Sequence, residues 1–300
     1  MDLRAKFKLA LLIMVVAGNL VLSQACSQVP LPGPPPPTQG SVLLGGDLLT
    51  TIPVGASPMG IVADGADRRL FVANSGSNNV SVIDASNDQV TATITVGRRP
   101  IGLGLVGSRP FPRLMVANEA SDSLTVIDPE TLLILTTIGL PAGSGPRDVS
   151  IHLASTSLDP NDTGYLAVSA NQGNNTVTGF EFRNAALVEQ TTLQLDLPDS
   201  VSSASVDSFW VSQQPGAVAL VRMPLLPVSP PDFGPAVFSR PLQNTGTADD
   251  VLAFRSQGQE VIAVANQAPA NVLALFTDPS PGDPIFQKEV PVGVNPEGLG

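Results

Sequence analysis

Short stretches in which apolar and polar residues alternate recur along most of this chain. In the stretch 90–96, valine, alanine and isoleucine residues alternate strictly with three threonines. A period of two places one face of a strand on a core and the other in water. The segments 60–63, 70–73 and 80–83 are also short and rich in apolar residues, and turn residues such as Asp64-Gly65 follow the first. The pattern predicts four successive β-strands.

This four-strand unit is repeated. The block LFVANSGSNNVSVIDASNDQVTATITVG (Leu70–Gly97) is followed by RLMVANEASDSLTVIDPETLLILTTIGLP (Arg113–Pro141), and by weaker copies such as VIAVANQAPANVLALF. Each unit begins after a turn that ends at Pro58, Pro100, Pro146, Pro198, Ala248 or Pro296. These anchors are 42, 46, 52, 50 and 48 residues apart, as four-stranded blades require. The sequence therefore predicts an all-β chain, a β-propeller of five complete repeats and the start of a sixth.

The units resemble the YVTN-repeat family of β-propellers. The family unit reads P-x-G-[IV]-A, then [LY]-[YF]-V-[AT]-N, then N-x-V-S-V-I-D, and ends I-x-V-G. This chain shows PMGIVA from Pro58, LFVAN from Leu70, NVSVID from Asn79 and ITVG from Ile94. The resemblance covers residues 51–300, strongly in the first two units and thinly in the fourth. It implies an exported binding or scaffolding module without a shared reaction. It also implies a ring of about seven blades, of which these residues form a truncated part.

The first 25 residues have the order of an export signal. Arg4, Lys6 and Lys8 precede an apolar run at 9–22, and Ser23-Gln24-Ala25 then forms a cleavage zone before Cys26. The 14-residue run is short for a membrane span, which needs roughly 20 residues. The segment resembles a bacterial lipoprotein signal, so we expect a signal peptide at 1–25 and a lipid on Cys26 in the cell envelope or periplasm. Simple secretion stays open, because Ser23 stands where such signals prefer leucine.

A proline-rich segment separates Cys26 from the repeats. VPLPGPPPPTQG occupies Val29–Gly40, and consecutive prolines favour an extended chain that cannot join a sheet. We expect residues 26–40 to be a stiff linker and residues 41–300 to be the propeller domain, incomplete at its C-terminal end.

Charge and composition narrow the function. The 15 basic and 26 acidic residues give a net charge of −11, which disfavours nucleic acid and leaves an N-terminal lipid as the contact with membranes. The chain contains one cysteine and one histidine, His152, so zinc sites and Cys–His catalysis are not expected. We expect His152 to have a structural role, and we expect no cofactor apart from calcium.

Two carboxylates could provide a calcium site. Asp148 and Asp250 stand at the position that Gly60 holds in the first unit, where the inner strand of a blade opens near the axis. Together with Asp249 they could bind calcium through oxygen ligands. Alternatively, each aspartate accepts hydrogen bonds from the backbone of its own turn.

Polar residues also recur after the second strand of the units. An asparagine stands there in four units, and two arginines, Arg98 and Arg99, lie in a turn on the same face. The asparagines either form a ring of amide donors or tolerate a left-handed backbone within their own turns. Trp210 is expected in the core between blades. The candidate binding residues on this face are Asn74, Arg98, Arg99, Asn118, Arg147, Asp148, Asp250 and Asn266.

These observations favour recognition of a protein or small-molecule partner without turnover. The alternative is an enzyme, either a lactonase-like hydrolase or the propeller portion of an oxidoreductase whose cofactor domain lies beyond residue 300. The mixed polar groups and the shortage of general acids and bases favour the binding module.

Overall fold

The computed structural model describes most of the repeat region. The described residues are 50–65, 67–107, 112–154, 164–183, 186–205, 208–214, 217–223, 238–241, 248–256, 259–266, 272–278 and 285–292. The predicted signal peptide, Cys26 and the proline-rich linker lie outside them. The described part consists of strands with two short 3-10 turns, η1 (Glu119–Ser121) and η2 (Gln172–Asn174). Within these residues, no helix is long and apolar enough to cross a membrane.

In the described residues, twenty strands form five four-stranded antiparallel sheets. Blade 1 contains β1 (Pro58–Asp64), β2 (Arg69–Asn74), β3 (Asn79–Asp84) and β4 (Gln89–Thr95). Blade 2 contains β5 (Pro100–Val106), β6 (Arg113–Asn118), β7 (Ser123–Ile127) and β8 (Ile134–Gly139). Blade 3 contains β9 (Pro146–Ala154), β10 (Gly164–Asn171), β11 (Thr176–Arg183) and β12 (Ala186–Gln194). Blade 4 contains β13 (Pro198–Ser205), β14 (Ser208–Gln213), β15 (Ala217–Arg222) and β16 (Phe238–Pro241). Blade 5 contains β17 (Ala248–Ser256), β18 (Gln259–Asn266), β19 (Val272–Asp278) and β20 (Ile285–Pro291).

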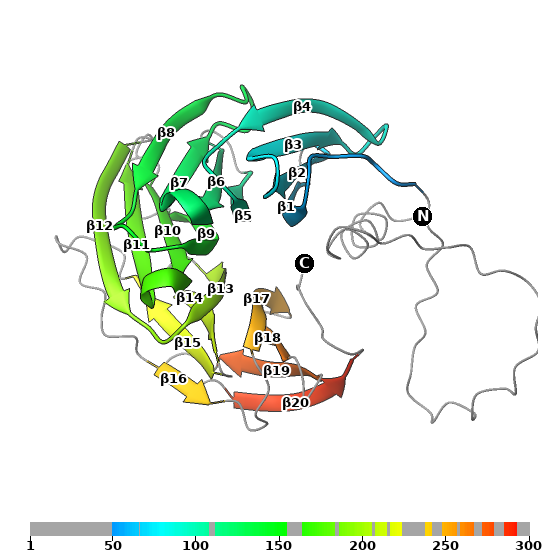
Figure 1. Cartoon of the computed structure of the whole chain (residues 1–300). Coiled ribbons are helices and arrows are strands. Elements are labelled where there is room, and N and C mark those ends of the chain that lie inside the picture. The colour runs from blue at the N-terminus through cyan, green and yellow to red at the C-terminus, as the bar shows by residue number, and fades with distance from the viewer. Residues whose placement is uncertain are drawn as a thin grey trace, which may run out of the picture.

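The blades follow one another around an axis in chain order (Figure 1). The first strand of each blade lies nearest the axis and the fourth lies on the outside. Within each sheet, consecutive strands pair side by side, so every blade is a simple meander. The prediction of four-stranded blades in five complete repeats is therefore confirmed.

The hydrophobic core lies between adjacent blades. Phe71 of blade 1 packs in one cluster with Leu114 of blade 2, and Met115 packs in the next with Phe180 of blade 3. Trp210, which is 1% exposed, belongs to the cluster that joins blades 4 and 5, as the sequence predicted. Blades 2, 3 and 4 thus bury both faces against neighbouring blades, which explains why their second and third strands are apolar on both sides.

The outer strands depart from the predicted alternation. The β3–β4 ladder pairs Ile83 with Val90 but Val82 with Ala92, so Thr91 is an extra residue. A bulge shifts the side-chain phase by one position, and Val90 is therefore exposed although Ile94 is buried. The outer strand of blade 2 begins at Ile134, two residues after Leu132, which has a left-handed backbone.

Candidate functional site

Repeated turns bring the chain to each inner strand. The residue before the anchor proline has a positive φ in four blades, at Ser57, Arg99, Gly145 and Leu197. The backbone of this turn bonds to the hairpin between the second and third strands of the same blade. In blade 2, for example, the N–H of Glu119 donates to the carbonyl of Arg99 at 3.0 Å. We call the surface formed by residues 97–100, 119–122, 142–147, 172–175 and 196–200 the axial rim. The prediction that these two sets of turns share one surface is confirmed.

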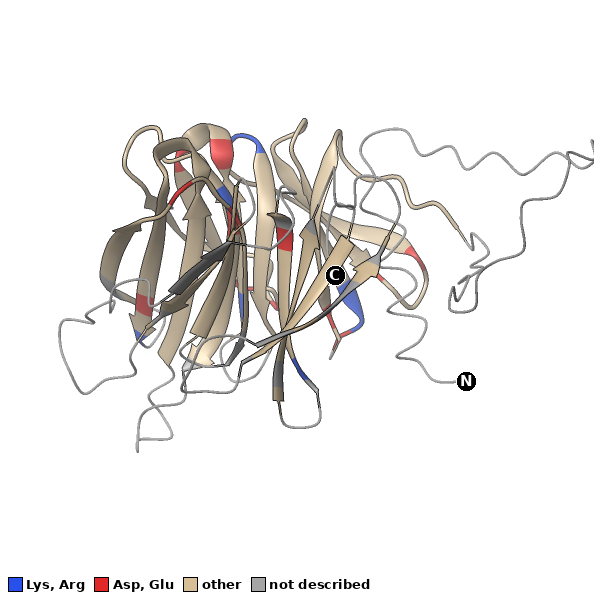
Figure 2. Cartoon of the chain, turned by 90° about the horizontal axis from the view of Figure 1, so that it is seen from below, with Lys and Arg blue, Asp and Glu red and all other residues tan. Residues whose placement is uncertain are grey.

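Both predicted arginines of the first turn lie on the axial rim. The Arg99 guanidinium is 58% exposed and its Nη1 lies 2.5 Å from Glu119 Oε2. Arg98 is exposed, and its Nη2 donates to the carbonyl of Ala120 at 2.6 Å. The backbone N–H of Arg99 donates to Asn78 Oδ1 at 2.8 Å, which ties the turn to blade 1. Acidic and basic positions accordingly adjoin along one edge of the blades (Figure 2).

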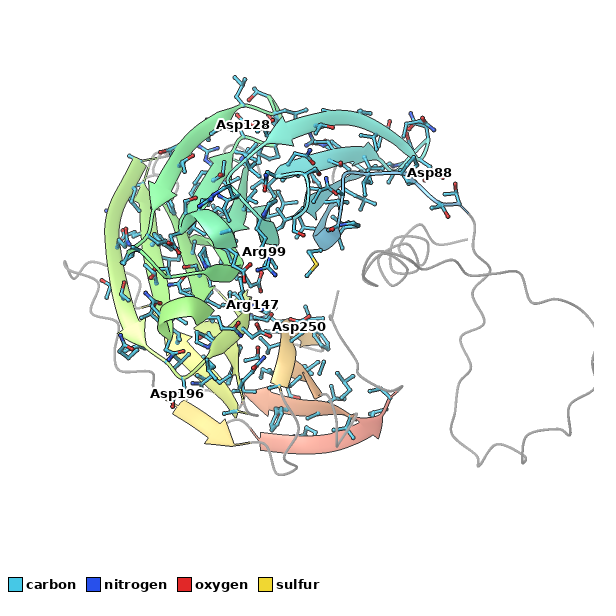
Figure 3. All side chains as sticks on the ribbon, in the orientation of Figure 1. Asp88, Arg99, Asp128, Arg147, Asp196 and Asp250 are labelled. Atoms are coloured by element: carbon cyan, nitrogen blue, oxygen red, sulfur yellow. The ribbon has the colours of Figure 1, made fainter. Side chains whose placement is uncertain are left out.

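Arg147 links blades 3 and 4 at the rim. Its Nε lies 2.6 Å from Asp199 Oδ1, and its Nη1 donates to Gln172 Oε1 at 3.2 Å. Gln172 Nε2 in turn donates to Asp199 Oδ1 at 3.2 Å, which closes a small network. Asp199 is buried, and this burial raises the pKa of its carboxyl group, while the charge of Arg147 opposes the rise. In Figure 3, Arg99, Arg147 and Asp250 lie toward the axis, whereas Asp88, Asp128 and Asp196 lie on the outer side.

Asp148 and Asp250 are connected through Ser200. Ser200 Oγ lies 3.1 Å from Asp148 Oδ2 and within hydrogen-bond distance of Asp250 Oδ1. The three residues occupy the same position in β9, β13 and β17, so the inner strands of three successive blades meet here. Asp148 Oδ2 also accepts the N–H of Val201 at 2.9 Å. Burial raises the pKa of the Asp148 carboxyl, and the hydrogen bonds from Val201, Val149 and Ser200 oppose the rise.

The backbones of neighbouring inner strands approach closely at this position. A Cβ atom on Gly102 of β5 would lie 2.5 Å from both Cα and Oδ1 of Asp148, and 2.6 Å from the carbonyl oxygen of Arg147. A Cβ on Gly60 would lie 2.3 Å from the carbonyl oxygen of Ile101. Glycine therefore provides the space in blades 1 and 2, and aspartate or serine occupies the position in blades 3 to 5.

The prediction that Asn74 and Asn118 belong to the binding surface is wrong. Both side chains are fully buried, and their amide groups form hydrogen bonds inside the blade. The Nδ2 of each donates at 2.9 Å to a hydroxyl in the third strand, that of Ser81 or Thr125. Asn171 makes the same 2.9 Å bond to Thr178. These asparagines do stabilise their own hairpins, but the left-handed residues are others, namely Asn78, Asp122 and Asn175.

The predicted calcium ligands are only partly described. Asp148 and Asp250 each accept the N–H of the following valine at 2.8 Å, as the turn interpretation expected. The side chains of Asp249 and Asn266 lie outside the described part. In the ranges that the structure describes, no three Asp, Glu, His or Cys residues group as a metal site. The calcium site stays a prediction. His152 is half-buried, with Nδ1 3.1 Å from the carbonyl oxygen of Leu153.

Sequence reasoning missed Ser200, Asp199 and Glu119. A signal was present for Ser200, because counting two residues from the Pro198 anchor gives the position of Asp148 and Asp250. No comparable signal existed for Glu119, whose contact with Arg99 depends on how the hairpin and the turn fold together.

No known protein family matches the chain, and no curated protein matches it. Solved structures do match. A putative 6-phosphogluconolactonase from Bacteroides uniformis gives a TM-score of 0.58 at 16% identity, covering 80% of this chain and 73% of that one. Hydrazine synthase from Kuenenia stuttgartiensis gives 0.55 at 17% identity, covering 82% and 69%. Dihydro-heme d1 dehydrogenase gives 0.52 at 17% identity, and the match covers 80% of this chain but only 47% of that protein. These likenesses show the β-propeller fold.

Proposed function

We propose that this chain is a β-propeller of the YVTN-repeat type that binds a partner through the axial rim without turning it over. We further propose that it is exported and anchored to the cell envelope through a lipid on Cys26. The repeat motifs of the first two units support the family, and the order of charged, apolar and small residues at 1–25 supports the export.

One observation carries the binding function. The exposed guanidinium of Arg99 pairs with Glu119 of the same blade, and the half-buried Arg147 bonds to Gln172 of blade 3 and to Asp199 of blade 4. Side chains fixed before binding lose little conformational entropy when a partner arrives, so a rim of this kind suits recognition. Their pairing with Glu119 and Asp199 leaves mixed charge on the rim, which favours a polar partner with both donors and acceptors.

Photo-crosslinking tests this function. A photo-reactive phenylalanine derivative replaces Arg98 on the rim in the full chain, expressed in its own cells. The same residue at Gln89, an exposed position at the start of the outer strand β4, is the matched control. We expect a covalent adduct of one defined mass from position 98 and none from position 89. Equal labelling at both positions, or no adduct at position 98, would contradict binding at the rim.

An enzyme is the second candidate, and the contacts of Ser200 favour it. A hydroxyl beside carboxylates can be activated by a general base, and burial makes Asp148 a stronger base than an ordinary aspartate. The similarity to a putative lactonase suggests lactones as the substrates to try. Lactone hydrolysis by the purified chain that disappears in Ser200→Ala would replace the binding proposal with this one. Absence of hydrolysis leaves the binding module as the function. Hydrolysis that is unchanged in Ser200→Ala would contradict both the role of Ser200 and binding without turnover.

A further inference from the structure

The Ser200 hydroxyl lies between two carboxyl groups. It is within hydrogen-bond distance of Asp148 Oδ2 and Asp250 Oδ1, yet a serine hydroxyl has only one hydrogen to donate. If both carboxyls were ionised, one of these contacts would place two acceptor oxygens against each other. A single added proton removes the conflict. One carboxylic O–H then donates to Ser200 Oγ, and the serine O–H donates to the other carboxylate.

The backbone hydrogen bonds to the two carboxyls are compatible with this proton. Val149 and Val201 donate backbone N–H groups to Asp148, and Val251 donates to Asp250. A protonated carboxyl oxygen keeps lone pairs that can still accept such a bond. These three backbone groups are donors, so they do not compete with Ser200 for the proton.

Burial has the larger effect on the pKa of Asp148 and raises it, whereas the charge of Arg147 lowers it. Arg147 lies on the same strand as Asp148, but its Nε contacts Asp199 at 2.6 Å, and Arg99 contacts Glu119. Of the strands packed against β9, β13 and β17, β5, β10 and β14 carry no charged residue, whereas β6 carries Arg113 and β18 carries Glu260 at their far ends. Among the described residues, the charged side chains at the same end as the clasp include Arg147 on β9, Asp199 on β13, Asp250 on β17, Glu119 in η1 and Arg99 before β5, and Asp249 precedes Asp250 in the sequence.

We propose that Asp148, Ser200 and Asp250 form a clasp that holds one shared proton and joins the inner strands of blades 3, 4 and 5. When the proton leaves to solvent, the net charge of the two carboxyl groups changes from minus one to minus two. The two carboxylates on either side of Ser200 then repel each other. The clasp therefore makes the packing of three blades at the axis sensitive to pH. The clasp goes beyond the proposed function, because it acts without a binding partner at the axial rim.

The sign of the effect follows from burial. Burial raises the pKa of Asp148 in the folded chain above the ordinary aspartate value. A group of this kind contributes stability that is complete below the unfolded pKa and is lost as the pH rises through the folded pKa. The clasp should hold in mild acid and open above the folded pKa. The pair titrates as a unit, so the proton belongs to the pair and not to one residue.

Urea unfolding of the full chain tests the clasp. Midpoints are compared at about pH 5 and about pH 8, the range over which proteins are usually most stable. In Asp250→Asn the amide donates to Ser200 at every pH, so the midpoint should fall less toward high pH than in the natural chain. Asp88→Asn removes the same charge at an exposed outer turn and should behave like the natural chain. An equal fall in both variants would overturn the clasp.

A titration of the natural chain covers the case in which Asp250→Asn does not fold. Carboxyl carbon resonances of the aspartates are followed by NMR and assigned with Asp148→Asn and Asp250→Asn. We expect the resonances of Asp148 and Asp250 to respond together to one proton, at a pH above the ordinary aspartate value of about 3.9. Separate titration of both carboxyls at or below that value would overturn the clasp.

Discussion

The carboxylate of Asp122 joins two blades through backbone groups. It accepts the N–H of Gly143 and the N–H of Gly145, each at 2.8 Å, and so holds the turn that leads from blade 2 into β9. Asp122 also has a left-handed backbone, with φ of 46°, which asparagine and aspartate tolerate better than alanine. One half-buried side chain thus fixes the place at which Arg147 and Asp148 enter the rim.

Asp122→Ala should lower the free energy of unfolding by about 2–4 kcal/mol, because two charge-assisted hydrogen bonds and a favourable backbone residue are lost together. Asp122→Asn keeps the backbone preference and one acceptor, so it should lose less. Asp88→Ala measures the backbone penalty alone, since Asp88 is exposed and also left-handed, with φ of 59°. Urea denaturation gives all three values. Equal losses in the two alanine variants would show that the inter-blade bonds contribute nothing.

Some residue roles could be predicted from the repeat and others could not. Recurrence identified the asparagines as important, but it did not reveal that Asn74 and Asn118 are buried. Their partners, Ser81 and Thr125, lie seven residues further on, across the hairpin, and a repeat pattern does not state which polar groups pair. The positions of Asp148 and Asp250 were predictable because they replace glycine at a fixed distance from the anchor. The contact of Ser200 with both carboxyl groups was not predicted.

Among the elements, the inner strands are the most constrained by their neighbours. In β5, Gly102 faces the backbone of Arg147 and Asp148 in β9, and a Cβ there would come within 2.6 Å of atoms that cannot move independently. In β8, by contrast, a Cβ on Gly139 would meet nothing within 4 Å. The two positions therefore provide a matched pair of substitutions in one blade.

Gly102→Ala should destabilise the chain by about 1–3 kcal/mol, the usual cost of forcing an extra carbon into a packed interior. It should also displace Asp148 and so change the pH dependence expected of the clasp. Gly139→Ala should be neutral or slightly stabilising, because it restricts the unfolded chain without a clash. Denaturation curves of the two variants provide the measurement. If Gly102→Ala were as stable as Gly139→Ala, the inner strands would not be packed as closely as described.

Among the elements, the outer strands were the ones that the sequence predicted least accurately. In the first unit the second and third strands were located within one residue at each end, since both faces of these strands are buried and their apolar runs are unambiguous. Each fourth strand pairs with only one other strand, so apolar residues in it can be exposed. Ile134 and Leu135 are exposed in this way, although in the sequence they look like core residues. The bulge at Thr91 also has no signal in a run that alternates perfectly.

At the scale of the whole molecule, the architecture was predictable because it depends on repetition. Successive blades pack face to face, so the strand pattern of one unit also predicts the strands of the others. Function does not follow in the same way, because the rim differs from blade to blade. Glycine, aspartate and serine exchange at one position of the inner strand while the fold stays the same. The matched structures, at 16–17% identity, share the fold and differ in their named activities.

The final prediction concerns how the molecule is held in the cell. Lipidation requires a thiol immediately after the cleavage zone, and Cys26 is the only cysteine in the sequence. Cys26→Ser should therefore move the protein from the membrane fraction to the soluble fraction of the cell envelope, without changing the denaturation midpoint of the blades. A lipid also adds mass to the mature N-terminus, which mass spectrometry detects in the natural chain and should not find in the variant. The proline-rich segment at 29–40 would then act as the spacer between anchor and propeller. If the natural chain is already soluble and its N-terminus carries no added mass, the protein is secreted without an anchor, and the axial rim meets its partner in solution.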